Sequence, residues 1–228
     1  MFGFFNKKTT WSNTMDLIRD LARVPQDGLK TRVHFDKSFE KFVPYMERSG
    51  EWIKYECPGM SRADNKMMGG YKFMTTINQG NIPKVMIEIV RNPAHDASVV
   101  TFTDLEKVNK YSTELFANAA QLAVGSECTL NFPYQDAHDA LEFLINYEEW
   151  LPMPAGSSQE LKVYDPSDFA ASMLNLSFCF SYKVALAGKT PLEGVCQVSG
   201  SRSFTEVRKL DRLPWGFDRP TPRIYERA

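Results

Sequence analysis

The segment Met173–Leu186, MLNLSFCFSYKVAL, decides which fold the sequence predicts. Large apolar residues occupy every second position, and the residues between them are mostly small or polar. This period of two is typical of a β-strand with one face on a core and the other in water. At about 3.3 Å per residue, a strand of roughly thirteen residues would span about 43 Å, whereas most strands have about five or six residues. We expect Phe178 and Phe180 to face a core.

A second segment, residues 195–210 (VCQVSGSRSFTEVRKL), follows the turn AGKTPLEG and is predicted to be the antiparallel partner of the long strand. The pair suits either an ordinary bent sheet with one face on a core, or the wall of a water-filled barrel to which several copies lend hairpins. The residues expected on the solvent-facing or lumen-facing side are Asn175, Ser177, Ser181, Lys183, Ser199, Ser201 and Ser203.

The rest of the chain mixes helical and strand patterns. Apolar residues at helical spacing predict helices, and short alternating runs predict strands. We therefore expect an α+β fold: a mostly antiparallel sheet or barrel-like sandwich, with a long C-terminal hairpin and two to four flanking helices. The predicted organisation is a single α+β domain over residues 1–212, with a helix-rich insertion at about 103–150, followed by an extended Pro-rich tail over residues 213–228. Helices are expected at 11–22, 39–46, 103–124 and 136–147, and further strands at 29–35, 51–57, 71–77, 84–90 and 160–165.

Composition is that of an ordinary globular protein. The chain has 228 residues, 43% hydrophobic and 24% charged, with a net charge of −1. With no basic excess, we expect no sequence-specific binding to nucleic acid. The start MFGFFNKK places its apolar residues before its lysines, the reverse of a secretory signal, and no apolar run approaches the length of a membrane span. The sequence thus predicts no signal peptide, no membrane partner and a cytoplasmic location.

Charge is unevenly distributed along the chain. Acidic residues dominate from Pro133 to Asn175, where Lys162 is the one lysine or arginine, and basic residues dominate residues 202–228. Two regions of opposite sign suit head-to-tail contact between copies. An ordinary solvated surface explains them equally well.

Histidine and cysteine offer little chemistry. The tetrapeptide AHDA occurs twice, and its His95, Asp96, His138 and Asp139 could supply nitrogen and oxygen ligands to a metal. Helix capping is the competing interpretation, because a carboxylate in the first turn pairs with free amides. The four cysteines show no CxxC spacing, and no nucleotide-binding or hydrolase motif is present. We therefore predict no catalytic, cofactor-binding or metal-binding residue, no cofactor and no enzymatic activity.

Two further segments suggest contacts between subunits. The loop over residues 58–70 is long for a compact domain, and flexible methionines suit a surface that packs when a neighbour arrives. Aromatic residues on an extended tail suggest docking onto another surface. The predicted subunit-interface residues are Met60, Arg62, Met67, Met68, Trp215, Phe217 and Tyr225.

The order of these segments resembles the tail-tube proteins of contractile-tailed bacteriophages. The resemblance rests on MDLIRDLARVPQDGLKTRVHF, WIKYECPGM, NQGNIPKVMIEIVRNPAHDASVV and ELKVYDPSDFAASMLNLSFCFSYKVAL. It covers about half of the chain in separated pieces. It does not cover the helices at 103–124 and 136–147 together, or anything after Leu186. In that family, each subunit contributes strands to a continuous inner barrel, and hexameric rings stack head to tail.

The resemblance implies a structural function. It predicts a self-assembling subunit of a phage or phage-like particle, a tail tube or an adjoining ring, stacking head to tail around a polar lumen. The expected partners are the chain itself and other particle proteins, first in the host cytoplasm and then in the virion or particle. The uncovered tail suits a specialised member such as a tube initiator, terminator or neck component. Two alternatives stay open: a small metal-dependent hydrolase using the AHD segments, and an adaptor that binds a protein through its aromatic tail.

Overall fold

The structure is a computed structural model that describes residues 28–35, 39–56, 71–92, 97–147, 156–166, 176–217, 219–220 and 226–227. It divides into two compact units, each described by itself. Unit 1 comprises residues 1–104 and 224–228, and unit 2 comprises residues 105–223. The boundary falls close to the start of the predicted helix-rich segment 103–150. The single domain expected over residues 1–212 stays a prediction.

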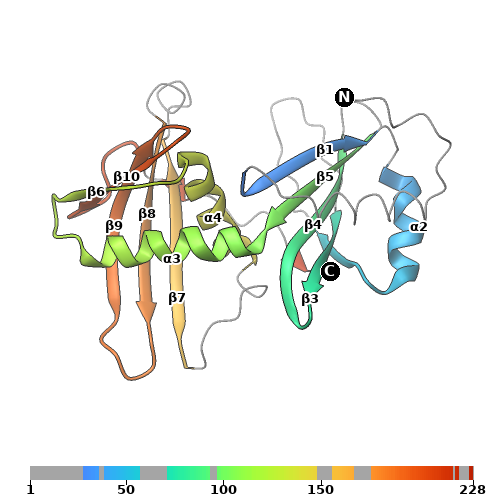
Figure 1. The fold of residues 1–228 in the computed structure, drawn as a ribbon, viewed down its shortest axis with the longest axis horizontal. Coiled ribbons are helices and arrows are strands. Elements are labelled where there is room, and N and C mark those ends of the chain that lie inside the picture. Colours follow the sequence, from blue (N-terminus) through green and yellow to red (C-terminus); the bar gives the residue numbers. More distant parts are fainter. Residues whose placement is uncertain are drawn as a thin grey trace. The chain divides into compact units, whose positions relative to one another are not determined.

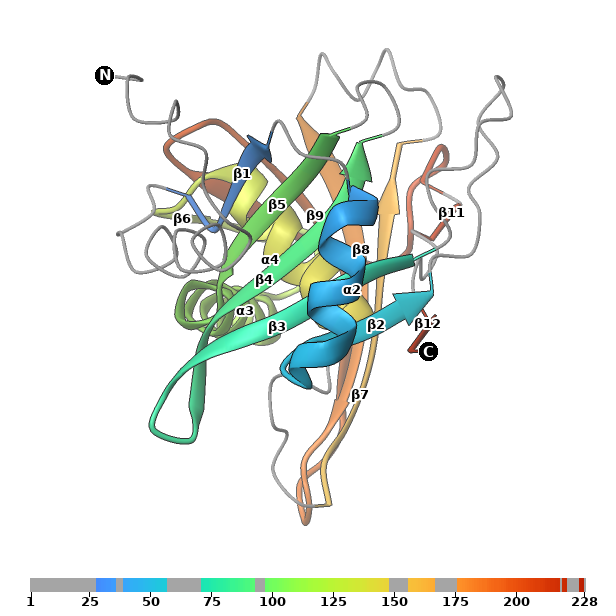
Figure 2. The ribbon, with the colours of Figure 1, turned by 90° about the vertical axis from the view of Figure 1, so that its right-hand side faces the viewer.

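Unit 1 is built on an antiparallel sheet. Its strands are β1 (Lys30–Phe35), β2 (Ile53–Glu56), β3 (Tyr71–Gln79), β4 (Ile82–Asn92), β5 (Ala97–Asp104) and the two-residue β12 (Glu226–Arg227), in the order β1-β5-β4-β3-β2-β12. The helix α2 (Phe39–Ser49) lies against one face (Figure 2), where Met46 packs with Trp52 and Phe73. The β3–β4 hairpin confirms the pairing expected for residues 71–77 and 84–90.

Unit 2 places two helices on one face of a second antiparallel sheet. The helices are α3 (Leu105–Gln121) and α4 (Tyr134–Tyr147), which confirm the two helical patterns predicted there. The sheet order is β11-β7-β8-β9-β10-β6, and Figure 1 labels all of these strands except β11. Its strands are β6 (Glu127–Leu130), β7 (Ser158–Asp165), β8 (Ser177–Ala185), β9 (Leu192–Gly200), β10 (Thr205–Leu210) and the two-residue β11 (Arg219–Pro220).

The fold class expected from the sequence is confirmed. Both sheets are antiparallel, β8 and β9 form the predicted C-terminal hairpin, and three helices are described. The strand pairing does not close either sheet into a barrel. No helix in the described part of the chain is long and apolar enough to serve as a membrane span.

Two details of the hairpin differ from the expectation. β8 has nine residues because Leu176, just before it, has a φ of 33°, which extended backbone does not adopt. The partner segment 195–210 is not one strand but two, β9 and β10, separated by a turn at residues 201–204. Gly200 is needed there, because a Cβ would collide with the carbonyl oxygen of Phe204, and the amide of Ser201 donates to that oxygen.

The core of unit 2 lies between its helices and one face of the sheet. Phe178 and Phe180 are both fully buried, as the alternation predicted. Phe180 meets the ring of Phe116 edge-on at 5.9 Å, and Phe178 packs against Tyr134 at 5.3 Å between ring centroids. The other buried apolar residues that β7 to β10 place on this core face are Val163, Tyr182, Cys196, Val198 and Val207, and Leu161 and Val184 pack there partly buried.

Candidate functional site

The opposite face of the unit 2 sheet is the main candidate for function. Strand alternation and register place polar and charged side chains there, in rows that cross the strands. We call this the polar face of unit 2. Its residues are Glu160, Lys162 and Tyr164 on β7, Ser177, Cys179, Ser181 and Lys183 on β8, Glu193, Val195, Gln197 and Ser199 on β9, and Glu206, Arg208 and Leu210 on β10.

Side-chain contacts agree with this assignment. Lys162 Nζ lies 2.9 Å from Glu160 Oε1 on the same strand. The hydroxyls of Tyr164 and Ser181 are 3.3 Å apart, across β7 and β8. The hydrogen bond to Lys162, the charge of Lys162 and the more distant charge of Lys183 together lower the pKa of Glu160. The polar face therefore carries at least one Glu–Lys ion pair and one contact between hydroxyls.

One row of the polar face alternates in charge. Glu160 on β7 is in register with Lys183 on β8, and Lys183 is in register with Glu193 on β9. Opposite charges on neighbouring strands stabilise a sheet by roughly 0.2–1 kcal/mol per pair. The row ends at Glu160, on the strand nearest the edge of the sheet.

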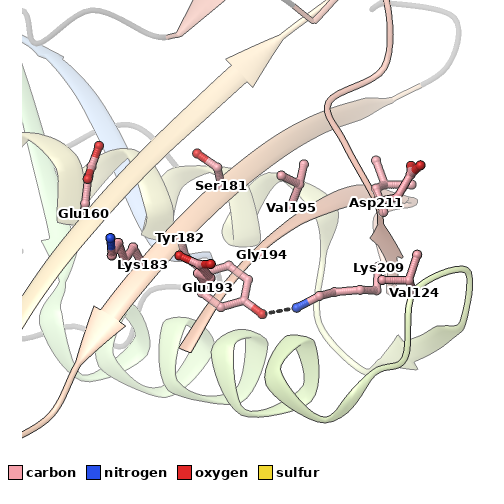
Figure 3. Close-up of a pocket in the computed structure, with 11 residues that line it drawn as sticks. Val124, Glu160, Ser181, Tyr182, Lys183, Glu193, Gly194, Val195, Lys209 and Asp211 are labelled. Atoms are coloured by element: carbon pink, nitrogen blue, oxygen red, sulfur yellow. Dashed lines mark hydrogen bonds between the residues drawn. The ribbon is translucent and has the colours of Figure 1, made fainter. Parts of the chain in front are cut away.

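An open cavity of about 490 Å³ lies where β10 stops beside the hairpin (Figure 3). Its lining combines Lys183 and Lys209 with Glu160, Glu193 and Asp211, so that charges of both signs face it. None of its lining residues is a histidine or a cysteine. The lining also contains the hydroxyls of Ser181 and Tyr182, and the Tyr182 hydroxyl accepts a hydrogen bond from Lys209.

Lys209 on β10 is a charged side chain that reaches into the core face of unit 2. It is 9% exposed, and its ammonium donates to the carbonyl of Ala119 in the last turn of α3, at 3.3 Å, and to the hydroxyl of Tyr182. A cation at a helix C-terminus is favourable because the last carbonyls carry partial negative charge. Gly194 makes room for it, because a Cβ there would lie 2.8 Å from Lys209 Cε and closer still to Nζ. This arrangement is structural support for α3.

The second AHDA segment, residues 137–140, lies within the described residues, and its His138 contacts Asp165. Its Nε2 lies 3.1 Å from Asp165 Oδ1, which joins α4 to the end of β7, and its ring meets Phe178 edge-on. Burial lowers the pKa of His138, but the hydrogen bond to Asp165 and the charges of Asp165, Glu142 and Asp139 outweigh it and raise the pKa above its usual value. The surroundings thus favour the protonated ring.

The same segment contains a group of side chains that could hold a metal. The ligand atoms of His138, Asp139 and Glu142 lie within 4.8 Å of one another. His95 and Asp96, from the first AHDA, lie outside the described residues. The expected absence of a metal stays a prediction.

The described cysteines have the properties of unreactive thiols. Burial, with a smaller contribution from Cys196, raises the pKa of Cys179 to about 12. Burial also raises the pKa of Cys196 to about 11, although the charge of Lys209 works against it, and burial raises that of Cys128. Because the thiolate is the nucleophile, these shifts oppose reactivity. Cys57 lies outside the described residues.

The structure brings several of the predicted solvent-facing residues together. Lys183 is exposed, and Ser181 and Ser199 are half-buried on the polar face. Ser177 shares this face but is only 6% exposed, so the expectation that it faces water is wrong. Its neighbour Cys179 is fully buried as well, so this end of β8 is covered on both faces. Ser201 and Ser203 lie in the turn between β9 and β10, and Asn175 lies outside the described residues.

Of the predicted subunit-interface residues, the structure describes two. Trp215 is fully exposed and Phe217 is half-buried, in a turn closed by a 3.3 Å hydrogen bond from the amide of Phe217 to the carbonyl of Pro214. The remaining interface residues lie outside the described residues: Met60, Arg62, Met67, Met68 and Tyr225.

Sequence reasoning missed the charged residues on the two strands beside β8. Glu160 and Lys162 flank the apolar Leu161, and Glu193 lies between Leu192 and Gly194; the alternation on β7 is the signal that could have identified Glu160 and Lys162. The missing information was the register that aligns them with Lys183.

Comparisons with known proteins place the chain in no family. No protein-family model matches it, and searches of the curated proteins and of the solved structures found no match.

Proposed function

We propose that this chain is a structural subunit that assembles with copies of itself, of the kind that builds a phage or phage-like particle. The observation that carries this proposal is the end of the unit 2 sheet where β7, β8 and β9 continue beyond β10. We call these residues, 158–160, 183–185 and 192–194, the projecting ribbon.

The projecting ribbon has an open edge on β9. β10 pairs only with Val195–Gly200, so among the described residues Leu192–Gly194 have β8 on one side and no strand on the other. Figure 1 shows β7, β8 and β9 extending past α3 at this end. Leu192 is 48% exposed at the tip. An extended ribbon with open edges is a liability in a monomer and a template for pairing in an assembly.

The polar face supports the finer part of the proposal. A sheet with one face on a core and an ordered polar face is suited to lining a water-filled space when copies assemble side by side. We extend the proposal to a tail tube or an adjoining ring, stacked head to tail, with Ser181, Lys183 and Ser199 facing the lumen. Contacts that propagate along an axis build such rings and filaments.

Trp215 is the candidate contact for a neighbouring subunit or particle protein. A fully exposed tryptophan leaves a large apolar surface in water, and tryptophan is enriched at protein interfaces. If Trp215 is buried by a neighbour, its fluorescence emission should shift to shorter wavelength as the protein is concentrated. The Trp215→Phe variant, which lacks this fluorophore, identifies its share of the signal.

The test of the proposal is negative-stain microscopy of purified protein at high concentration, together with sedimentation velocity. We expect rings or tubes from the wild-type chain. Leu192→Asp should abolish them, because it places a charge at the tip of the projecting ribbon. Ile82→Asp is the matched control, since Ile82 is 61% exposed on the β3–β4 hairpin of unit 1. A chain that stays monomeric at every concentration would contradict the proposal.

A further inference from the structure

Among the described residues, the outer edge of β7 has no partner strand along most of its length. β8 pairs with one side of β7, from Ser158 to Tyr164. On the other side, β11 pairs only with Tyr164 and Asp165. Among the described residues, Ser158–Val163 therefore present six residues of strand edge with no neighbouring strand. Backbone amides and carbonyls along such an edge can pair with another chain.

The charged side chains along this edge are self-complementary: reversing the direction of the strand exchanges an acidic residue for a basic one. Glu160 and Lys162 are exposed on the polar face, at equal distances on either side of Leu161. Glu160 also ends the alternating row that runs from Glu193 through Lys183. A strand paired with the open edge would place one residue opposite Glu160. A cation is favoured at that position, because it would continue the alternation of charge.

We propose that the β7 edges of two copies pair antiparallel, with the two-fold axis at Leu161. In this register Glu160 lies opposite the partner's Lys162, and Lys162 lies opposite the partner's Glu160. The alternating row then continues across the contact: Glu193, Lys183, Glu160 and the partner's Lys162. The surface is thus an interface for a second copy of this chain.

Charge and the position of β11 select this register over its neighbours. Antiparallel pairing keeps the polar faces of both sheets on one side only if the register changes by steps of two residues. Centring the pair on Glu160 would place two glutamates opposite each other, and centring it on Lys162 would do the same with two lysines. Like charges in that position are destabilising. The Lys162-centred register would also use the edge of Tyr164, which β11 already occupies.

This inference rests on the proposed function, since both require self-association, but it assigns one contact and its symmetry. A two-fold contact uses the same surface on both copies and is closed after two. The β7 edge therefore builds pairs. Contacts that propagate a ring or tube must use other surfaces, such as Leu192–Gly194 at the β9 edge of the projecting ribbon.

The decisive experiment uses two single variants, Glu160→Lys and Lys162→Glu, studied by sedimentation equilibrium alone and as an equal mixture. Alone, each variant opposes like charges at both positions, and we expect its dissociation constant to rise roughly tenfold or more, because two attractive contacts are replaced by two repulsive ones. In the mixture, lysines of one chain meet glutamates of the other. Association should therefore return to within about threefold of wild type.

A matched control has the same charge change on the same face. Glu206 is exposed on β10, which pairs with β9 on one side and β6 on the other, so its edges are covered. Glu206→Lys should leave association unchanged. Circular dichroism of all variants confirms that they are folded.

The possible results separate this inference from the proposed function. The β7 contact would be overturned, and self-assembly left intact, by either of two results. One is a dissociation constant that neither single variant changes, and the other is weakened association that the mixture does not restore. A wild-type chain with no association at all would overturn both. The Leu161-centred register would be supported if the mixture associates like wild type, each single variant associates more weakly, and Glu206→Lys behaves as wild type.

Discussion

The core face and the polar face of unit 2 are made from the same strands but differ in burial and charge. On the core face, Phe178 and Phe180 are fully buried beneath α3 and α4. On the polar face, Lys183 is exposed and its neighbours in the row are Glu160 and Glu193. We infer that the core face determines folding, whereas the polar face and the edges beside it determine assembly. The predictions below test that division.

The largest expected effect is a charge placed on the core face. Phe178→Asp should unfold unit 2, because burying an unpaired carboxylate costs several kcal/mol and the lost ring leaves a cavity. Ser181→Asp adds the same group on the polar face and should change the free energy of unfolding by less than about 1 kcal/mol. Urea unfolding followed by circular dichroism measures both. Equal losses from the two variants would mean that the faces have been misassigned.

The next effect concerns Lys209, whose ammonium reaches into the core face of unit 2. Gly194→Ala should destabilise the wild-type chain by about 1–3 kcal/mol, since the added Cβ displaces the Lys209 ammonium from Ala119 and Tyr182. In a Lys209→Ala background the same change should cost little. A double-mutant cycle by urea unfolding gives the coupling free energy. A cycle with no coupling would show that Gly194 is not required for this contact.

A smaller effect on the polar face should appear in association alone. Lys162→Glu should weaken self-association while leaving the free energy of unfolding of the monomer nearly unchanged, because Lys162 is half exposed in an ion pair at the surface. Sedimentation and urea unfolding of the same sample separate the two quantities. A variant that loses both folding and association would break the proposed division between the faces.

The smallest effect is the pH dependence that His138 contributes. Its pKa in the folded chain is raised above the usual 6.5, so the stabilisation is fully present below about pH 6.5 and is lost as the pH rises through the raised value. The melting temperature of the wild-type chain should therefore fall over that interval relative to His138→Gln. A thermal-unfolding series from pH 5 to pH 8 compares them. Parallel curves would show that the Asp165 contact does not stabilise protonated His138.

The fold could be predicted well where one physical signal dominated. Period-two alternation placed Phe178 and Phe180 on the core, and helical spacing located α3 and α4 to within a few residues. The strand break at Leu176 and the turn after Gly200 could not be predicted in the same way. Both depend on local backbone geometry within segments whose side-chain pattern is continuous.

The candidate site was less accessible to sequence reasoning. Serines and Lys183 on β8 were identified from the hairpin alone, but Glu160 and Glu193 acquire their meaning only from the register that aligns them with Lys183. Ser177 was expected in water, because alternation gives the side of a strand and not what covers it. Burial at that end of β8 is a tertiary property that the strand pattern does not contain.

The most direct test of the central claim is hydrogen exchange, measured by mass spectrometry in dilute and in concentrated protein. Exchange reports the opening of individual backbone hydrogen bonds, so it distinguishes an edge that gains a partner from a strand that is already paired. The account predicts that amides of residues 158–163 exchange more slowly in concentrated protein, while those of residues 205–210 on β10 do not change. Slowing on association that leaves residues 158–163 unaffected would contradict it.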